Sequence, residues 1–190
     1  MACLRRSAHV ASFVLIAGVT ACDRGPKERV EAAPSAAASA PIERGPLAVG
    51  DPAPEVTLHL QDGKQVALSS LKGQQVVVYF YPKDDTPGCT VEAQGFRDDH
   101  AAFESAKVRV FGVSLQDASS HQAFIDKYEL PFDLVVDTKG ELAAAFGVPV
   151  RGEYAARQTF LIGADGKVKR IWRDVDPKAH SKELLAAIAE

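Results

Sequence analysis

One cysteine stands where an apolar strand is expected to give way to a helix. Residues 79–90 read YFYPKDDTPGCT, so the apolar run passes through two prolines and a glycine before and around Cys89. A thiol at a helix N-terminus lies near free backbone N–H groups and the positive end of the helix dipole, and both favour the thiolate. Because the thiolate is the nucleophilic form, this position predicts a reactive cysteine. The alternative is a small buried core residue, a common role of free cysteines.

The N-terminal residues have the pattern of a targeting segment. Arg5 and Arg6 precede an apolar stretch over residues 10–21, which is short for a membrane span and suits a signal-peptide core. The stretch ends in VTAC, which resembles the processing site of a bacterial lipoprotein. We therefore predict a signal peptide over 1–21, lipid attachment at Cys22, and an exported, membrane-anchored lipoprotein on a periplasmic or other extracytoplasmic face. The alternative is an ordinary secretory signal with a chance cysteine near its end.

Removal of residues 1–21 would leave Cys89 as the one free thiol of the mature chain, because Cys3 is lost and Cys22 carries lipid. A disulfide scaffold is then excluded, and an unpaired cysteine in an exported protein indicates a reactive thiol. The same cleavage removes two arginines and no acid, so the formal net charge moves from −3 to −5. An acidic chain without a basic patch gives no reason to expect nucleic acid as a partner.

Residues 22–46 are predicted to form a flexible, lipid-attached linker. They are rich in Ala, Pro, Ser, Glu and Arg and include the run AAPSAAASAP. Such a segment buries too little apolar area to offset the entropy lost on ordering. The folded domain is therefore predicted over residues 47–190, held off the membrane by this tether.

Hydrophobic periodicity predicts a succession of strands and helices in residues 47–190. Alternating apolar residues around the dipeptide Asp62-Gly63 predict an N-terminal β-hairpin. The continuous apolar runs 76–81 and 108–115 are typical of strands covered on both faces. The expected strands span residues 56–60, 66–68, 76–81, 108–115, 134–136, 159–162 and 168–172.

Helical spacing of apolar residues predicts a helix from Cys89 in which Ala93, Phe96 and Phe103 share the buried face. Strands that alternate with helices describe an α/β fold with a mixed central sheet and helices on both faces. Two further helices are expected over residues 119–128 and 141–146. A final helix is expected after Asp176-Pro177, which has the pattern of an N-cap and a first helical residue.

The spacing Pro82-x-x-x-Thr86-x-x-Cys89, with Arg157 at the start of the later run RQTFLIG, resembles the active site of a peroxiredoxin. The surrounding residues are similar to the Q-type branch, also called bacterioferritin comigratory protein. The resemblance extends from about residue 47 to the C-terminus and implies a thioredoxin-like fold with an N-terminal hairpin extension. It also implies a thiol-dependent peroxidase that reduces hydrogen peroxide and small organic hydroperoxides without a cofactor.

The resemblance gives each matched residue a role. Cys89 would attack the peroxide O–O bond and become a sulfenic acid. Pro82 would shield the thiolate, Thr86 would hydrogen-bond both sulfur and peroxide, and Arg157 would hold both by charge-assisted contacts. A lowered thiol pKa alone would raise the rate only a few-fold, because nucleophilicity falls with basicity. Transition-state stabilisation by Thr86 and Arg157 is therefore expected to carry most of the acceleration.

The other polar residues near Cys89 are expected to do less. Asp84 and Asp85 are interpreted as solvated loop charges, because acids close to the sulfur would oppose thiolate formation. Glu92 suits the positive end of the helix dipole, with a catalytic role as the alternative. No metal site is expected, because metal-ligand spacing is missing among His9, His59, His100, His121 and His180.

Many Q-type members carry a resolving cysteine five residues after the peroxidatic one, and this position holds Gln94. We therefore predict a one-cysteine cycle in which an external thiol, small or from a thioredoxin-like protein, reduces the sulfenic acid. The family resemblance also implies a monomer. Two other functions remain open. A thiol–disulfide oxidoreductase is disfavoured because Thr86 replaces the first cysteine of a Cys-x-x-Cys pair. A non-enzymatic redox sensor or binding module would use Cys89 as a switch.

Overall fold

The long apolar runs form the middle of a five-stranded sheet. Its strands are β3 (Gln75–Phe80), β4 (Val108–Ser114), β5 (Asp133–Val136), β8 (Gln158–Ile162) and β9 (Val168–Trp172). They lie in the order β5-β4-β3-β8-β9. The pairs β3–β4 and β4–β5 are parallel, whereas β8 runs antiparallel to both β3 and β9. The predicted mixed sheet is therefore confirmed.

This computed structural model describes residues 46–189, which lie in a compact unit that spans Ile42–Glu190. The predicted signal peptide over 1–21, the lipid attachment at Cys22 and nearly all of the predicted linker fall outside the described residues. Between residues 46 and 189, no helix is both long enough and apolar enough to cross a membrane.

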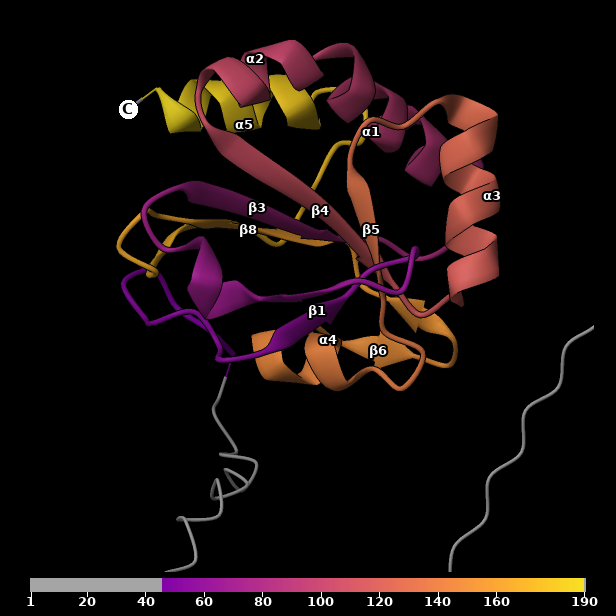
Figure 1. Cartoon of the computed structure of the whole chain (residues 1–190), viewed down its shortest axis with the longest axis horizontal. Coiled ribbons are helices and arrows are strands. Elements are labelled where there is room, and N and C mark those ends of the chain that lie inside the picture. The colour runs from indigo at the N-terminus through magenta and orange to yellow at the C-terminus, as the bar shows by residue number, and fades with distance from the viewer. Residues whose placement is uncertain (1–45, 190) are drawn as a thin grey trace, which may run out of the picture. The chain divides into compact units, whose positions relative to one another are not determined.

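Helices cover both faces of the sheet, as predicted (Figure 1). One face packs against α1 (Pro87–Asp98), α2 (His100–Ser105), α3 (Ala118–Tyr128) and α5 (His180–Ile188). The other face packs against α4 (Glu141–Phe146) and the N-terminal hairpin. Along β3, Val77 and Tyr79 enter the first core while Val76, Val78 and Phe80 enter the second. This alternation is the period of two of a strand buried on both faces.

Two small hairpins accompany the sheet. The first pairs β1 (Thr57–His59) with β2 (Gln65–Ala67) across Asp62-Gly63 and leads into the 3-10 helix η1 (Leu68–Leu71), so the N-terminal hairpin is confirmed. The second pairs β6 (Val150–Arg151) with β7 (Tyr154–Ala155) and was not predicted. Its strands are two residues long, which is too short for a hydrophobic period to reveal.

The last helix begins later than predicted. Asp176 is not its N-cap, because α5 starts at His180 with Ala179 in the capping position. The carbonyl of Asp176 accepts backbone hydrogen bonds from Ala179 and His180, and its carboxylate accepts one from the N–H of Lys178. Asp176 therefore closes a turn of its own before the helix begins.

The predicted buried face of the first helix is split between two helices. Cys89, Ala93 and Phe96 lie in α1 and are buried, as expected. Phe103 lies in α2, because Asp99 leaves the helical conformation and ends α1. The two helices still share one core, since the rings of Phe96 and Phe103 lie 5.7 Å apart.

Candidate active site

Cys89 lies in the first turn of α1, directly after the loop that leaves β3. Thr86 is the N-cap residue in extended conformation, and Pro87 occupies the first helical position. Proline suits this position because its missing N–H would have no partner inside the helix. The first backbone hydrogen bond of α1 runs from the N–H of Thr90 to the carbonyl of Thr86. The N–H of Cys89 lies one residue earlier, among the N–H groups at a helix start that have no acceptor within the helix. The thiol is thus held at the positive end of the helix, and the residue is only 2% exposed.

Arg157 reaches the sulfur from the neighbouring strand. It directly precedes β8, whose first residue Gln158 pairs with Phe80 at the end of β3. Its Nη2 donates to Cys89 Sγ at 3.2 Å. Gly88 lies close to this guanidinium, since an added Cβ there would come into van der Waals contact with Nη2 at 3.4 Å. The antiparallel pairing of β8 with β3 therefore brings a cation to the thiol.

The same guanidinium is bonded to Glu92, one helical turn after Cys89. Nη1 of Arg157 donates to Glu92 Oε2, while Glu92 Oε1 has no hydrogen-bond partner among the described residues. Burial raises the pKa of Glu92 to about 7, although the charge of Arg157 acts in the opposite direction. Burial by itself lowers the pKa of Arg157, but the charges of Glu92 and Cys89 outweigh it and raise the pKa. Arg157 is therefore held cationic between a thiol and a carboxyl group.

Glu92 was predicted as a favourable charge in the first helical turn, with a catalytic role as the alternative. Its contact with Arg157 was missed because the two residues are 65 positions apart in the chain. One signal was available. Cys89 and Glu92 are three residues apart, a spacing that places two side chains on the same face of a helix.

The other two predicted site residues lie in the loop between β3 and α1. Thr86 is half-buried, and its hydroxyl donates to the carbonyl of Lys83 at 3.1 Å. Pro82 is half-buried and follows Tyr81, whose backbone N–H still bonds to β4 through Val113. Thus the structure brings Cys89 and Arg157 into contact, while the Thr86 hydroxyl is engaged by its own loop.

The prediction for Asp84 was wrong, since this residue is buried rather than solvated. Its carboxylate accepts hydrogen bonds from Tyr81, Ser120 and His121. Burial would raise the pKa of Asp84, but these bonds, with that of His121 first, outweigh it and lower the pKa. Asp85 is exposed, as predicted, and pairs with Lys127 at 2.6 Å.

Gln94 leaves the sulfur without a second cysteine in this part of the chain. It lies half-buried in α1, which runs without a break from Pro87 to Asp98. Between residues 46 and 189, Cys89 is the only cysteine and its thiol is free. An internal disulfide therefore has no partner among the described residues.

A thioredoxin-like sheet that presents a cysteine at a helix start, with an arginine from the adjacent strand, defines a thiol peroxidase. The comparisons agree, because the model of the AhpC/TSA family matches residues 49–171. The chain is 43% identical to the chloroplastic peroxiredoxin Q of Triticum aestivum over 155 residues, which is 80% of this chain and 71% of that protein. It is 40% identical to the peroxiredoxin Bcp of Bacillus subtilis over 151 residues, which is 76% of this chain and 96% of that protein.

Solved structures give the same result. Peroxiredoxin Q of Xanthomonas campestris aligns with a TM-score of 0.68 and 35% identity, over 72% of this chain and 91% of that one. Peroxidoxin BcpB of Mycobacterium tuberculosis aligns with a TM-score of 0.69 and 32% identity, over 74% of this chain and 96% of that one. The chain belongs to the AhpC/TSA family and, within it, to the peroxiredoxins of the Q/Bcp type. It is a thiol-dependent peroxidase, and the predicted thioredoxin-like fold is confirmed.

Proposed function

We propose that this peroxidase works by a one-cysteine cycle, in which Cys89 reduces hydrogen peroxide or a small organic hydroperoxide and a thiol of another molecule restores it. The observation that carries the proposal is the contact between Cys89 Sγ and Arg157 Nη2 at 3.2 Å. It gives the sulfur a fixed cation in a site that is largely closed to water. A cation in such a place stabilises negative charge far more than one in bulk water.

In the oxidising step, the thiolate of Cys89 attacks one oxygen of the peroxide. The S–O bond forms as the O–O bond breaks, and the departing oxygen leaves as hydroxide or alkoxide and takes up a proton. Sulfur is oxidised to a sulfenic acid, and the peroxide is reduced to water or an alcohol. Negative charge moves from the sulfur to the departing oxygen, so Arg157 acts by stabilising the transition state. We assign to Thr86 the hydrogen bonds to the peroxide and to Pro82 the shielding of the thiolate.

In the reducing step, a thiol from outside attacks the sulfenic sulfur, releases water and forms a mixed disulfide. A second thiol then breaks this disulfide and restores Cys89. The lack of a second cysteine between residues 46 and 189 supports this route. The partner is either a small thiol or a thioredoxin-like protein, because both supply the pair of thiols that the balance requires.

A peroxide-consumption assay with several reductants tests the cycle. Wild type should turn over many equivalents of hydrogen peroxide with at least one thiol reductant, and Cys89→Ser should not. Non-reducing mass analysis of the oxidised protein should show a sulfenic acid or a mixed disulfide at Cys89. Slow oxidation that stops after one equivalent with every reductant would favour the alternative, a redox sensor. An internal disulfide at Cys89 would contradict the one-cysteine cycle.

We also propose that the chain is an exported lipoprotein that acts as a monomer at a membrane surface. The support is the sequence pattern around Cys22 and the Ala- and Pro-rich residues that follow it. Two or three acyl chains bind a membrane far more firmly than one. Cys22→Ser should therefore move the protein from the membrane fraction to the soluble fraction, with unchanged peroxidase activity. Membrane association that survives this substitution would contradict the lipid anchor.

A further inference from the structure

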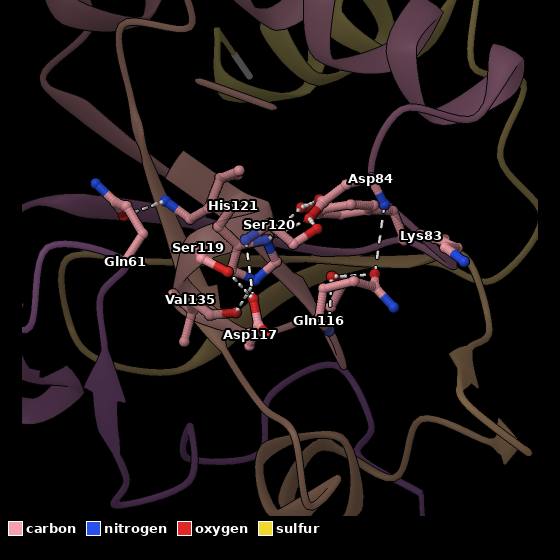
Figure 2. Close-up of polar contacts among 12 residues, drawn as sticks. Gln61, Lys83, Asp84, Gln116, Asp117, Ser119, Ser120, His121 and Val135 are labelled. Atoms are coloured by element: carbon pink, nitrogen blue, oxygen red, sulfur yellow. Dashed lines mark hydrogen bonds and ion pairs between the residues drawn. The ribbon is translucent and has the colours of Figure 1, made fainter. Parts of the chain in front are cut away.

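His121 in α3 is buried between two hydrogen-bond acceptors. The residue is 0% exposed. Its Nδ1 lies 2.9 Å from Asp84 Oδ2, and its Nε2 lies 3.1 Å from the carbonyl oxygen of Val135 in β5. Figure 2 shows the ring between these two groups, which come from the loop after β3 and from the edge strand of the sheet.

The partners of Asp84 indicate the protonation state of the pair. Tyr81 donates to Oδ1 at 2.6 Å, and the hydroxyl of Ser120 donates to Oδ2 at 2.7 Å. Against the effect of burial, these bonds and that of His121 lower the pKa of Asp84, so at neutral pH the group is a carboxylate, which has acceptors only. The carbonyl of Val135 is also an acceptor only, so both nitrogens of His121 must carry a proton. The geometry thus describes an imidazolium paired with a carboxylate in the protein interior.

The charged and titratable groups that face this ring come from several elements. Asp84 and Tyr81 approach from the loop, with the Tyr81 hydroxyl 3.5 Å from Nδ1. Asp117, the N-cap of α3, is exposed and carries the second negative charge near the ring. Opposite, β5 contributes only the neutral carbonyl of Val135. The net environment is negative, which suits a cationic ring.

Asp84 connects this pair to the reactive cysteine. It lies between Pro82 and Thr86, the two loop residues of the active-site motif. Its backbone N–H is also held at 3.3 Å by the side chain of Gln116, which follows β4. Two residues after Asp84, the hydroxyl of Thr86 closes the turn onto Lys83 just before the helix of Cys89 begins. The loop that starts α1 is thereby fixed to α3 and to β5.

We propose that His121 is a positioning residue of the peroxidase: through the buried pair with Asp84 it fixes the loop at 82–86, and so holds Cys89 in register with Arg157. This inference deepens the proposed function and rests on Cys89 as the peroxidatic residue. His121 does not contact the sulfur, so it acts on the alignment of the reacting groups and not on the chemistry itself. A displacement of about 1 Å in such an alignment is enough to slow a reaction about a hundredfold.

The chain contains a matched control in the next residue. Asp85 lies in the same loop and also binds α3, through Lys127 and Tyr128. Its side chain is 49% exposed, whereas that of Asp84 is 5% exposed. Exposed ion pairs contribute little to holding a structure, and a buried one that loses a partner leaves an uncompensated charge. The same Asp→Asn change should therefore act very differently at the two positions.

The test compares two reactions of Cys89 in the full-length chain. One is the single-turnover rate with hydrogen peroxide, which requires Arg157 in place. The other is the rate of alkylation by iodoacetamide, which requires only an accessible thiolate. Peptide mass analysis follows the modification of Cys89 in both reactions. Asp84→Asn and His121→Gln should lower the ratio of the peroxide rate to the alkylation rate at least tenfold. Asp85→Asn should change it less than about twofold.

The double variant of Asp84→Asn with His121→Gln should lose no more than the worse single variant, because the pair acts as one unit. An unchanged ratio in both single variants, or an equal loss in Asp85→Asn, would overturn the proposal. If the single variants do not fold, Tyr81→Phe keeps the shape and removes one donor to Asp84, and should lower the same ratio about three-fold or more. A wild type without peroxidase turnover would instead refute the proposed function.

A second measurement needs no substitution. Long-range proton–nitrogen NMR spectra of the wild-type protein distinguish an imidazolium from either neutral tautomer. At neutral pH the ring of His121 should give the signals of two protonated nitrogens. A neutral ring at that pH would overturn the pair and with it the positioning role.

Discussion

Arg157 joins the reactive sulfur of Cys89 to Glu92, a buried residue one helical turn further along α1. The guanidinium uses Nη1 for the carboxyl group and Nη2 for Cys89 Sγ, so one planar cation holds both groups at once. The guanidinium makes this possible, because its two terminal nitrogens carry separate N–H donors in one rigid plane. The orientation of the cation that faces the sulfur is therefore set by a residue that does not touch the sulfur.

Replacing Arg157 should slow oxidation far more than it changes the titration of the thiol. Arg157→Ala removes the cation that stabilises charge in the transition state, and a loss of about 100-fold to 1,000-fold in the rate with peroxide is expected. Arg157→Lys keeps the charge but cannot contact Glu92 and Cys89 together, so a large loss should remain. Stopped-flow oxidation and thiolate absorbance measure the two quantities. Equal changes in rate and titration would contradict this prediction.

Glu92 should make stability depend on pH in a direction opposite to that of most carboxyl groups. Burial raises its pKa to about 7 in the folded chain, from 4.5. The protonated group stabilises the fold below about pH 4.5, and this stability is lost as the pH rises through about 7, because the unfolded chain gives up its proton first. The free energy of unfolding should therefore fall by about 3 kcal/mol over this window from this residue alone.

Glu92→Gln isolates that contribution, because glutamine has the same shape and does not titrate. Urea unfolding of both proteins should show the wild type losing stability relative to the variant between about pH 5 and about pH 8. Groups that titrate elsewhere cancel in the difference. A difference that instead grows in favour of the wild type would mean that the attraction of Arg157 exceeds the cost of burial.

Gly112 in β4 should tolerate no larger residue. An added Cβ would lie 2.7 Å from Leu134 Cδ2 and equally close to the ring of Tyr79, and both side chains are fully buried. Two packed neighbours would have to move, so Gly112→Ala should cost about 1 to 3 kcal/mol of unfolding free energy. Thermal or urea unfolding measures this, and a variant as stable as the wild type would show that the core can shift.

The sequence predicted best what depends on neighbouring residues. The apolar runs of β3 and β4 and the turn at Asp62-Gly63 are local patterns, and all were found in the structure. The helix predicted from Cys89 was also found, and it begins two residues earlier, at Pro87. Arg157 was placed correctly only because a family pattern named it, since its contact with Cys89 joins residues 68 positions apart. Local chemistry alone would have left it a surface charge.

The failures concern charges whose partners are distant in sequence. Asp84 has the type and the setting of a solvated loop residue, and only the fold brings His121, 37 positions later, against it. Glu92 was read as a helix-end charge for the same reason. In both cases a buried carboxyl group lies against a specific basic side chain, and no periodicity in the sequence reports such a pair.

Gln94 offers a test of how the sulfenic acid is lost when no thiol is present. Residues 89 and 94 are separated by about 7.5 Å along the axis of an intact helix. A disulfide requires Cα atoms within about 7 Å and side chains that face each other. In Gln94→Cys, oxidised Cys89 should therefore be trapped as a disulfide only if the start of α1 unwinds. Far-UV circular dichroism should show a loss of helix on oxidation that a reductant reverses.

The same variant should protect Cys89 from further oxidation. In the wild type the sulfenic acid has no internal partner, so excess peroxide without a reductant should carry it on to the irreversible sulfinic acid. In Gln94→Cys the disulfide competes with that second oxidation, and the sulfinic fraction found by peptide mass analysis should fall several-fold. Gln94→Ser, which lacks the thiol, should behave like the wild type. Equal sulfinic fractions in all three proteins would mean that α1 does not open on the timescale of the second oxidation. The external thiol would then have to reach Cys89 within the folded site.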